Sequence, residues 1–143
     1  MKTSRKFVAL SLIFCLLFTV GASAINGSKV QMRSSDSGDI SSTTHYSNLN
    51  TKTGFYEYSA SVIGFNGSSS AYVAIVIQQD VNGTWTNVPG SFRSDTETGS
   101  YAGADGSRMV MSGYWYRTQA TYIINKNGKE SKIVENSDQY WYA

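Results

Sequence analysis

The sequence predicts an all-β fold, a sandwich or barrel of antiparallel strands that follows an N-terminal signal peptide. Beyond residue 24 the chain is poor in Leu and rich in Tyr, Ser, Thr, Gly and Val, residue types that favour strands and turns. Several segments alternate apolar and polar residues with the period of two that a half-buried strand requires. Apolar residues do not recur at helical spacing over three turns in any stretch, so we expect no long helix.

The first 24 residues have the three parts of a secretory signal peptide. Lys2, Arg5 and Lys6 precede an uncharged apolar run over residues 7–20, and a small-residue A-x-A pattern ends at Ala24. The run is about 14 residues long, shorter than the ~20 that a membrane-spanning helix needs. We therefore expect cleavage after Ala24, secretion, and no permanent membrane anchor.

Cleavage would also change the chemistry of the exported chain. The single cysteine, Cys15, lies inside the signal, and the bulky Phe14 before it does not suit a lipoprotein site. Three of the 12 basic residues leave with the signal, so 9 basic face 10 acidic residues and the formal net charge falls from +2 to about −1. A nucleic-acid partner is not expected, because such binding depends on an accumulated positive field. The remaining 119 of 143 residues suit one domain.

The chain after the signal divides at residue 54. Residues 25–53 predict a polar N-terminal arm with a possible short strand at 30–33, and residues 54–143 predict the β domain. The first clear strand begins at Phe55. Its residues Tyr56, Tyr58, Ala60 and Val62 alternate with polar ones, which indicates one buried face.

The middle of the domain predicts a hairpin followed by a weakly structured stretch. Residues 71–77 are apolar on both faces, as in a central strand that is covered on each side. Asn82-Gly83 predicts a tight turn into a strand at 84–88, since both residues tolerate positive φ. Residues 89–107 are mostly polar and predict one weak strand.

The longest alternation begins at Tyr114. Tyr114, Tyr116 and Ala120 share one face and Trp115 the other, so inward tyrosines would turn Trp115 outward. Tyr114 or Tyr116 has the place of a tyrosine corner, a tyrosine near the start of a late strand. A turn at residues 125–128 leads to a strand at 129–135, and residues 139–142 predict a final strand.

Two parts of the domain resemble a largely uncharacterised family of small secreted proteins of Gram-positive bacteria. Residues 112–122 and 128–131 are similar to its "sGyyYRvkAtY" strand and Gly-x-Glu turn, and residues 73–88 to its "ItLQk…nGsWxxV" hairpin. The resemblance covers about residues 55–142, with Thr118 where a larger aliphatic residue is usual. It implies a single antiparallel β-sandwich of the immunoglobulin or fibronectin type III kind, and it implies no catalytic residues.

Aromatic side chains are the candidate ligand-binding groups. Trp85, Trp115 and Trp141, with Arg117, are the predicted binding residues, because exposed indole rings can stack on sugar rings or on a protein partner. Tyr101, Tyr114 and Tyr140 are possible further members of this platform. For any one tryptophan, however, packing in the core is the favoured interpretation, because loops can cover the outer face of a sandwich strand.

Catalytic and metal sites are not expected. His45 is the single histidine, no Gly-x-Ser-x-Gly elbow accompanies it, and an exposed loop histidine is the favoured interpretation. Asp95, Glu97 and Asp105 fall in one Gly-rich polar stretch that could bind calcium, although the spacing fits no EF-hand and a solvated turn is favoured. A zinc site of nitrogen and sulfur ligands is not expected in a chain with one histidine and no cysteine after cleavage, and no cofactor is expected.

These observations favour a secreted, non-catalytic binding module for an extracellular glycan or protein. The alternative is a secreted antagonistic protein, bacteriocin-like and membrane-active. The near-neutral charge and the lack of a cationic amphipathic segment disfavour simple attraction to anionic membranes. An enzyme ranks third.

Overall fold

The computed structural model describes residues 29–33 and 38–143, so the predicted signal peptide and Cys15 lie outside the described residues. This part of the chain is all β, and within it no helix is long and apolar enough to cross a lipid bilayer. Its strands are β1 (Lys29–Arg33), β2 (Ile40–Asn50), β3 (Phe55–Gly64), β4 (Ser70–Val81), β5 (Thr84–Asn87), β6 (Arg93–Thr98), β7 (Tyr101–Met109), β8 (Tyr114–Lys126), β9 (Lys129–Asn136) and β10 (Tyr140–Tyr142).

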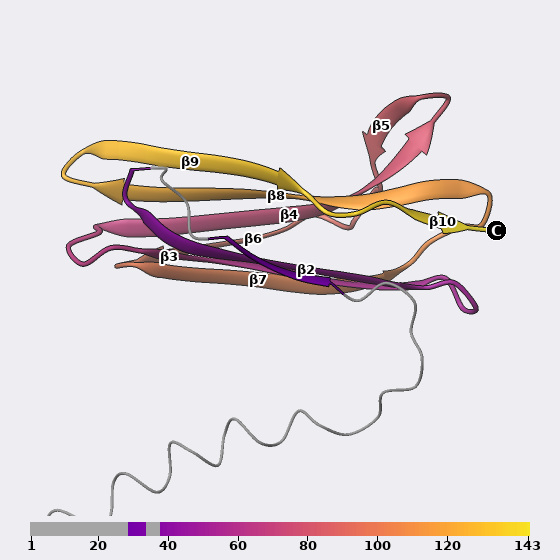
Figure 1. Ribbon diagram of the computed structural model, residues 1–143, viewed down its shortest axis with the longest axis horizontal. Coiled ribbons are helices and arrows are strands. Elements are labelled where there is room, and N and C mark those ends of the chain that lie inside the picture. The colour runs from indigo at the N-terminus through magenta and orange to yellow at the C-terminus, as the bar shows by residue number, and fades with distance from the viewer. Residues whose placement is uncertain (1–28, 34–37) are drawn as a thin grey trace, which may run out of the picture.

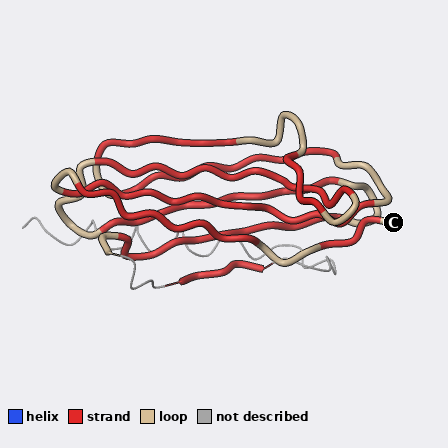
Figure 2. The backbone as a smooth tube through the Cα atoms, turned by 90° about the horizontal axis from the view of Figure 1, so that it is seen from above, coloured by secondary structure: helices blue, strands red, loops and turns tan. Residues whose placement is uncertain are grey.

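The strands form two antiparallel sheets, which appear as two layers in Figure 1. The four-stranded sheet has the order β1-β2-β3-β7. The six-stranded sheet has the order β10-β8-β4-β5, with β9 on β8 and β6 on β4. Seen from above, the strands run along the long axis of the molecule (Figure 2). The all-β, antiparallel prediction is confirmed.

Tyrosine rings from both sheets make up much of the core. The predicted inward residues of β3 are buried, and so are Tyr116 and Ala120 of β8. The ring of Tyr56 makes edge-to-face contacts with Tyr58, Tyr116 and Tyr140, with centroids 5.9 to 6.5 Å apart. Such contacts add to the free energy gained from burying the rings. The alternation that predicted β3 and β8 therefore also predicted their buried faces.

Two Asn-Gly turns set the register of the hairpins in the six-stranded sheet. Asn82 and Gly83, between β4 and β5, have φ angles of 54° and 83°. Asn127 and Gly128, between β8 and β9, have φ angles of 51° and 74°. Two consecutive positive φ angles are the mark of the tight turn that matches strand twist. β4 lies between β8 and the pair β5 and β6, as predicted for a central strand.

The prediction of a polar arm over residues 25–53 is wrong for its second half. Residues 40–50 form β2, which pairs with both β1 and β3, and the possible short strand corresponds to β1. The inward side chains of β2 include Thr43, His45, Ser47 and Leu49, and all four are buried. Three of the four are polar, so this buried strand lacks the apolar alternation by which the other strands were recognised.

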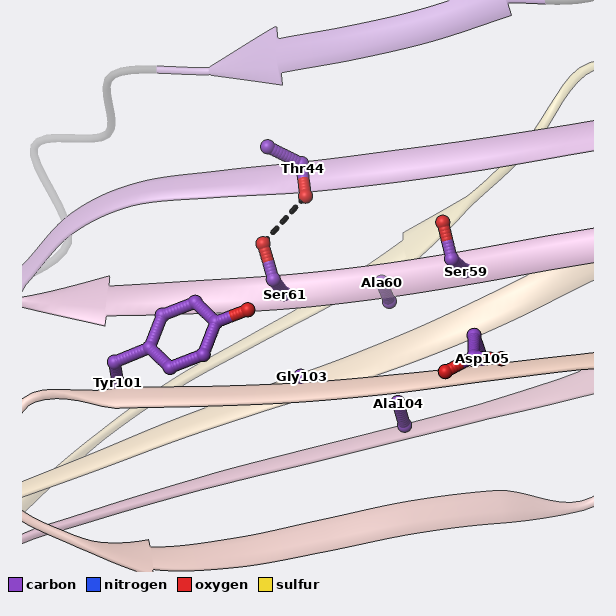
Figure 3. Close-up of a pocket in the computed structure, with 8 residues that line it drawn as sticks. All are labelled: Thr44, Ser59, Ala60, Ser61, Tyr101, Gly103, Ala104 and Asp105. Atoms are coloured by element: carbon purple, nitrogen blue, oxygen red, sulfur yellow. Dashed lines mark hydrogen bonds between the residues drawn. The ribbon is translucent and has the colours of Figure 1, made fainter. Parts of the chain in front are cut away.

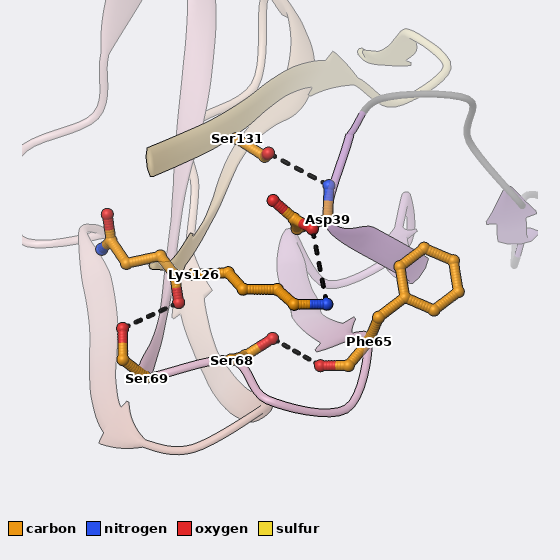
Figure 4. A network of polar contacts seen from close by, with 7 residues as sticks. Asp39, Phe65, Ser68, Ser69, Lys126 and Ser131 are labelled. Carbon is orange, nitrogen blue, oxygen red and sulfur yellow. Dashed lines mark hydrogen bonds and ion pairs between the residues drawn. The ribbon is translucent and has the colours of Figure 1, made fainter. Parts of the chain in front are cut away.

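The start of β2 is tied to the six-stranded sheet by polar contacts (Figure 4). The Asp39 backbone N–H donates to Ser131 Oγ at 3.1 Å, and the Asp39 carboxylate lies 3.7 Å from Lys126 Nζ. The Phe65 backbone N–H donates to the Asp39 carbonyl at 3.0 Å. These contacts join the start of β2 to the β8–β9 hairpin and to the turn that follows β3.

The polar stretch 89–107 contains two strands where one was predicted. β6 pairs with β4 in the six-stranded sheet, whereas β7 pairs with β3 in the four-stranded sheet. The chain therefore passes from one sheet to the other between Thr98 and Tyr101. Because most side chains of β6 are exposed, its sequence lacks a strong apolar pattern.

Candidate functional site

Two of the predicted binding residues, Trp115 and Trp141, lie side by side. They are directly opposite each other in the β8–β10 pair, on the outer face of the six-stranded sheet. Their ring centroids are 5.6 Å apart, and 44% and 46% of these residues remain exposed. Tyr116 and Ala120 point inward and Trp115 points outward, so the favoured interpretation of core packing does not hold for Trp115. Two large rings in contact, each half exposed, form an apolar surface at this end of the molecule.

The other two predicted residues, Arg117 and Trp85, also contact each other. The guanidinium carbon of Arg117 lies 4.3 Å from the centroid of the Trp85 ring, a cation–π contact. Arg117 Nε donates to Gln78 Oε1 at 2.9 Å, and Gln78 Nε2 donates to Asn87 Oδ1 at 3.1 Å. Partial burial lowers the pKa of the Arg117 guanidinium from its ordinary value, because desolvation disfavours the charged form.

Both pairs belong to one surface. Trp115 and Arg117 are two residues apart on β8 and thus share a face, and Arg117 is opposite Gln78 on β4. β10 and β5 lie at the same end of the molecule (Figure 1). We call the surface formed by Trp141, Trp115, Arg117 and Trp85 the tryptophan face.

Gln78 and Asn87 are parts of this surface that the sequence analysis did not single out. The pairing of Gln78 with Asn87 was predictable from the sequence. A two-residue turn at Asn82-Gly83 places Gln78 opposite Asn87 and Asp80 opposite Trp85. The pairing of Gln78 with Arg117 has no such local signal, since β4 and β8 are distant in sequence.

The three tyrosines considered with the tryptophans lie elsewhere. Tyr101 is 57% exposed but belongs to β7 of the four-stranded sheet. Tyr114 and Tyr140 are half-buried and pack against the core, and the Tyr140 hydroxyl donates to the Ser47 carbonyl at 3.1 Å. The tryptophan face therefore contains indoles and Arg117 but none of these tyrosines.

Tyr116 makes the hydrogen bond of a tyrosine corner. Its hydroxyl donates to the Met111 carbonyl, five residues upstream, at 2.7 Å. Burial raises the pKa of this hydroxyl, so it stays a donor. Of the two tyrosines predicted for this role, Tyr116 makes the bond.

The prediction that His45 is an exposed loop residue is wrong. His45 is on β2, 2% exposed, and its Nε2 lies 2.7 Å from Thr118 Oγ1 of the opposite sheet. Burial lowers its pKa to about 4, which keeps the ring neutral near pH 7. Thr118, which departs from the pattern of the resembling family, thus has a defined polar partner.

The three acidic residues considered for calcium do not share a loop. Asp95 and Glu97 are on β6, Asp105 is on β7, and Asp95 Oδ2 accepts from the Gly103 backbone N–H at 3.1 Å. Among the residues that the structure describes, no group of three or more His, Cys, Asp or Glu side chains is placed to hold a metal ion.

A shallow groove of about 270 Å³ crosses the outer face of the four-stranded sheet (Figure 3). Thr44 and Ser61, opposite each other on β2 and β3, line it, and their hydroxyl oxygens are 2.6 Å apart in a hydrogen bond. Tyr101 lies along one end, where its hydroxyl would be only 2.7 Å from a Cβ at Gly103. Small side chains and this glycine therefore leave the groove open.

Comparison of the chain with protein-family models, with curated proteins and with solved structures gave no match.

Proposed function

We propose that this protein is a secreted, non-catalytic binding module, and that the tryptophan face holds an extracellular ligand such as a cell-wall glycan. Secretion is supported by the signal-peptide features of residues 1–24. A single immunoglobulin-like β-sandwich is proposed as its fold. The two antiparallel sheets and the Tyr116 hydrogen bond support that assignment.

The observation that carries the proposal is the Trp115–Trp141 pair. Each residue remains nearly half exposed although an apolar ring gains free energy from burial. The faces of sugar rings carry C–H groups, so a sugar placed on an indole buries apolar surface on both partners. Clustered exposed apolar side chains on a soluble domain are typical of an interaction site.

Arg117 and Trp85 supply the polar side of the same surface. Binding sites for small ligands combine apolar area with a few polar groups in fixed positions. The contacts of Arg117 with Trp85 and Gln78 restrain its side chain before any ligand arrives. Such restraint lowers the entropy lost on binding.

Retention of the purified chain, without residues 1–24, on immobilised peptidoglycan and a panel of polysaccharides tests the proposal. We expect retention on at least one of them, and Trp115→Ala to weaken it by about tenfold or more, as for a central binding residue. Tyr101→Ala is the matched control, because Tyr101 is an exposed aromatic on the other sheet. If no glycan retains the wild type, or if the two variants bind equally well, the proposed function is wrong.

A further inference from the structure

Arg117 is held in place on the tryptophan face, yet no acidic side chain among the described residues forms an ion pair with it. Its Nε is hydrogen-bonded to Gln78, and its guanidinium carbon lies over the Trp85 ring. Within residues 29–33 and 38–143, its two terminal nitrogens have neither a hydrogen bond nor an ion pair. Charged N–H donors that have no partner in the protein are the groups to which an anionic ligand would bind most strongly.

The neighbours of Arg117 on this face leave its terminal nitrogens to the solvent. Gln78 and Asn87 are neutral amides that hydrogen-bond to each other. Asp80, opposite Trp85, accepts from the Gly83 backbone N–H at 2.7 Å, and within the described residues it forms no ion pair with Arg117. Because Arg117 is only half-buried, water can solvate these nitrogens in the free protein, and a ligand anion would replace that water.

The free group suits a carboxylate on a sugar ring. A guanidinium presents parallel N–H donors that match two oxygens of a carboxylate or of a phosphate, and such bidentate pairs are among the strongest hydrogen bonds in proteins. A carboxylate can be bonded directly to the carbon skeleton of a sugar, whereas a phosphate is attached through an oxygen, so the carboxylate stays closer to a ring stacked on the indole pair. The Nε is occupied by Gln78, so the two terminal nitrogens are the pair that remains.

The position of the free group relative to Trp115 favours a sugar that bears the carboxylate. The Cα atoms of two residues on one face of a strand are about 7 Å apart. The guanidinium of Arg117 lies over Trp85, on the β4 and β5 side of β8, whereas Trp141 is on the β10 side. A sugar stacked on the indole pair would therefore reach Arg117 through a substituent or through the next sugar unit of the chain.

We propose that the tryptophan face recognises acidic glycans of the uronic-acid type, with a sugar ring on Trp115 and Trp141 and a carboxylate on the terminal nitrogens of Arg117. This inference rests on the proposed function and narrows its ligand class.

Polygalacturonate and its methyl-esterified form test the inference, because esterification removes the charge and keeps the sugar chain. We expect the wild type to bind polygalacturonate at least about tenfold more tightly than the ester. Arg117→Gln should abolish that preference, and Arg117→Lys, which keeps the charge but not the fork of donors, should reduce it. Arg108→Gln is the matched control, since it removes the same charge from an exposed site on β7.

Each outcome bears on a different claim. Equal binding of acid and ester by the wild type overturns the carboxylate inference and leaves glycan binding standing. The same holds if neither form binds while another polysaccharide of the panel does. Poly-glutamate carries carboxylates without sugar rings, so binding as tight as that of polygalacturonate overturns the sugar part. Because the acid–ester comparison uses the wild type, it decides the inference even if an Arg117 variant fails to fold.

Discussion

The outer faces of the two sheets carry different kinds of side chain, although both are formed by every second residue of their strands. On the six-stranded sheet, the outward positions hold Trp115, Trp141 and Arg117, and these side chains contact one another or their neighbours. On the four-stranded sheet, the outward positions around Ser61 and Gly103 are small and line a shallow groove. Alternation decides which residues face outward, whereas residue size and chemistry decide whether the face can hold a ligand.

The largest expected effect comes from the core on which both faces rest. Tyr56→Ala removes the ring that contacts Tyr58, Tyr116 and Tyr140. We expect the free energy of unfolding to fall by about 3–5 kcal/mol, as for other large aromatic truncations. Denaturation in urea measures it. Tyr101→Ala, at an exposed site, should change the value by no more than about 0.5 kcal/mol. Similar losses for the two variants would contradict the described core.

A pH-dependent effect should follow from His45, whose ring links the two sheets through Thr118. Its pKa is about 4 in the folded state and about 6.5 when unfolded, so the unfolded chain takes up the proton first. The neutral His45 ring makes its full contribution to the free energy of unfolding above pH 6.5. That contribution declines as the pH falls from 6.5 to 4. The total loss is on the order of 3 kcal/mol.

The measurement is the free energy of unfolding of wild type and His45→Gln between pH 8 and pH 4. The other titrating groups are common to both chains, so the difference between them reports on His45. We expect the wild type to lose more stability than the variant over this range. Parallel curves would show that His45 is not buried and neutral in the folded protein.

A smaller effect sharpens the contrast between the faces. The Arg117–Trp85 contact should contribute a coupling of about 0.5–1 kcal/mol to stability, typical of a cation–π pair at the protein surface. A double-mutant cycle with Arg117→Gln and Trp85→Leu measures it. A coupling of zero would mean that Trp85 does not restrain Arg117 and that the tryptophan face is less ordered than described.

The strands that bury apolar side chains could be predicted from the sequence alone. The alternation around Tyr56 and Tyr116 and the turns at Asn82-Gly83 and Asn127-Gly128 predicted β3, β4, β8 and β9 because apolar burial and positive φ leave local signatures. β2 was missed because its inward Thr43, His45 and Ser47 are polar. Two of the three have a hydrogen-bond partner in the other sheet, His45 with Thr118 and Ser47 with Tyr140, and no local pattern in the sequence reveals such partners.

The candidate site was predictable in part for the same reason. The alternation along β8 turned Trp115 outward, and the hairpin turn set Trp85 opposite Asp80. That Trp141 lies against Trp115, and Arg117 over Trp85, depends on long-range strand pairing. Local sequence patterns carry no information about such pairing, so the four residues could be named but not assembled.

The most direct test of the central claim uses the indole N–H signals of the three tryptophans in a two-dimensional NMR spectrum. The titrant is the polysaccharide that retains the protein most tightly, and single Trp→Phe variants assign the signals. We expect the Trp115 and Trp141 signals to shift with added ligand and the signal of the Gly103 backbone amide, in the groove of the other sheet, to stay unchanged. A shift of Gly103 with unchanged indole signals would contradict the proposal.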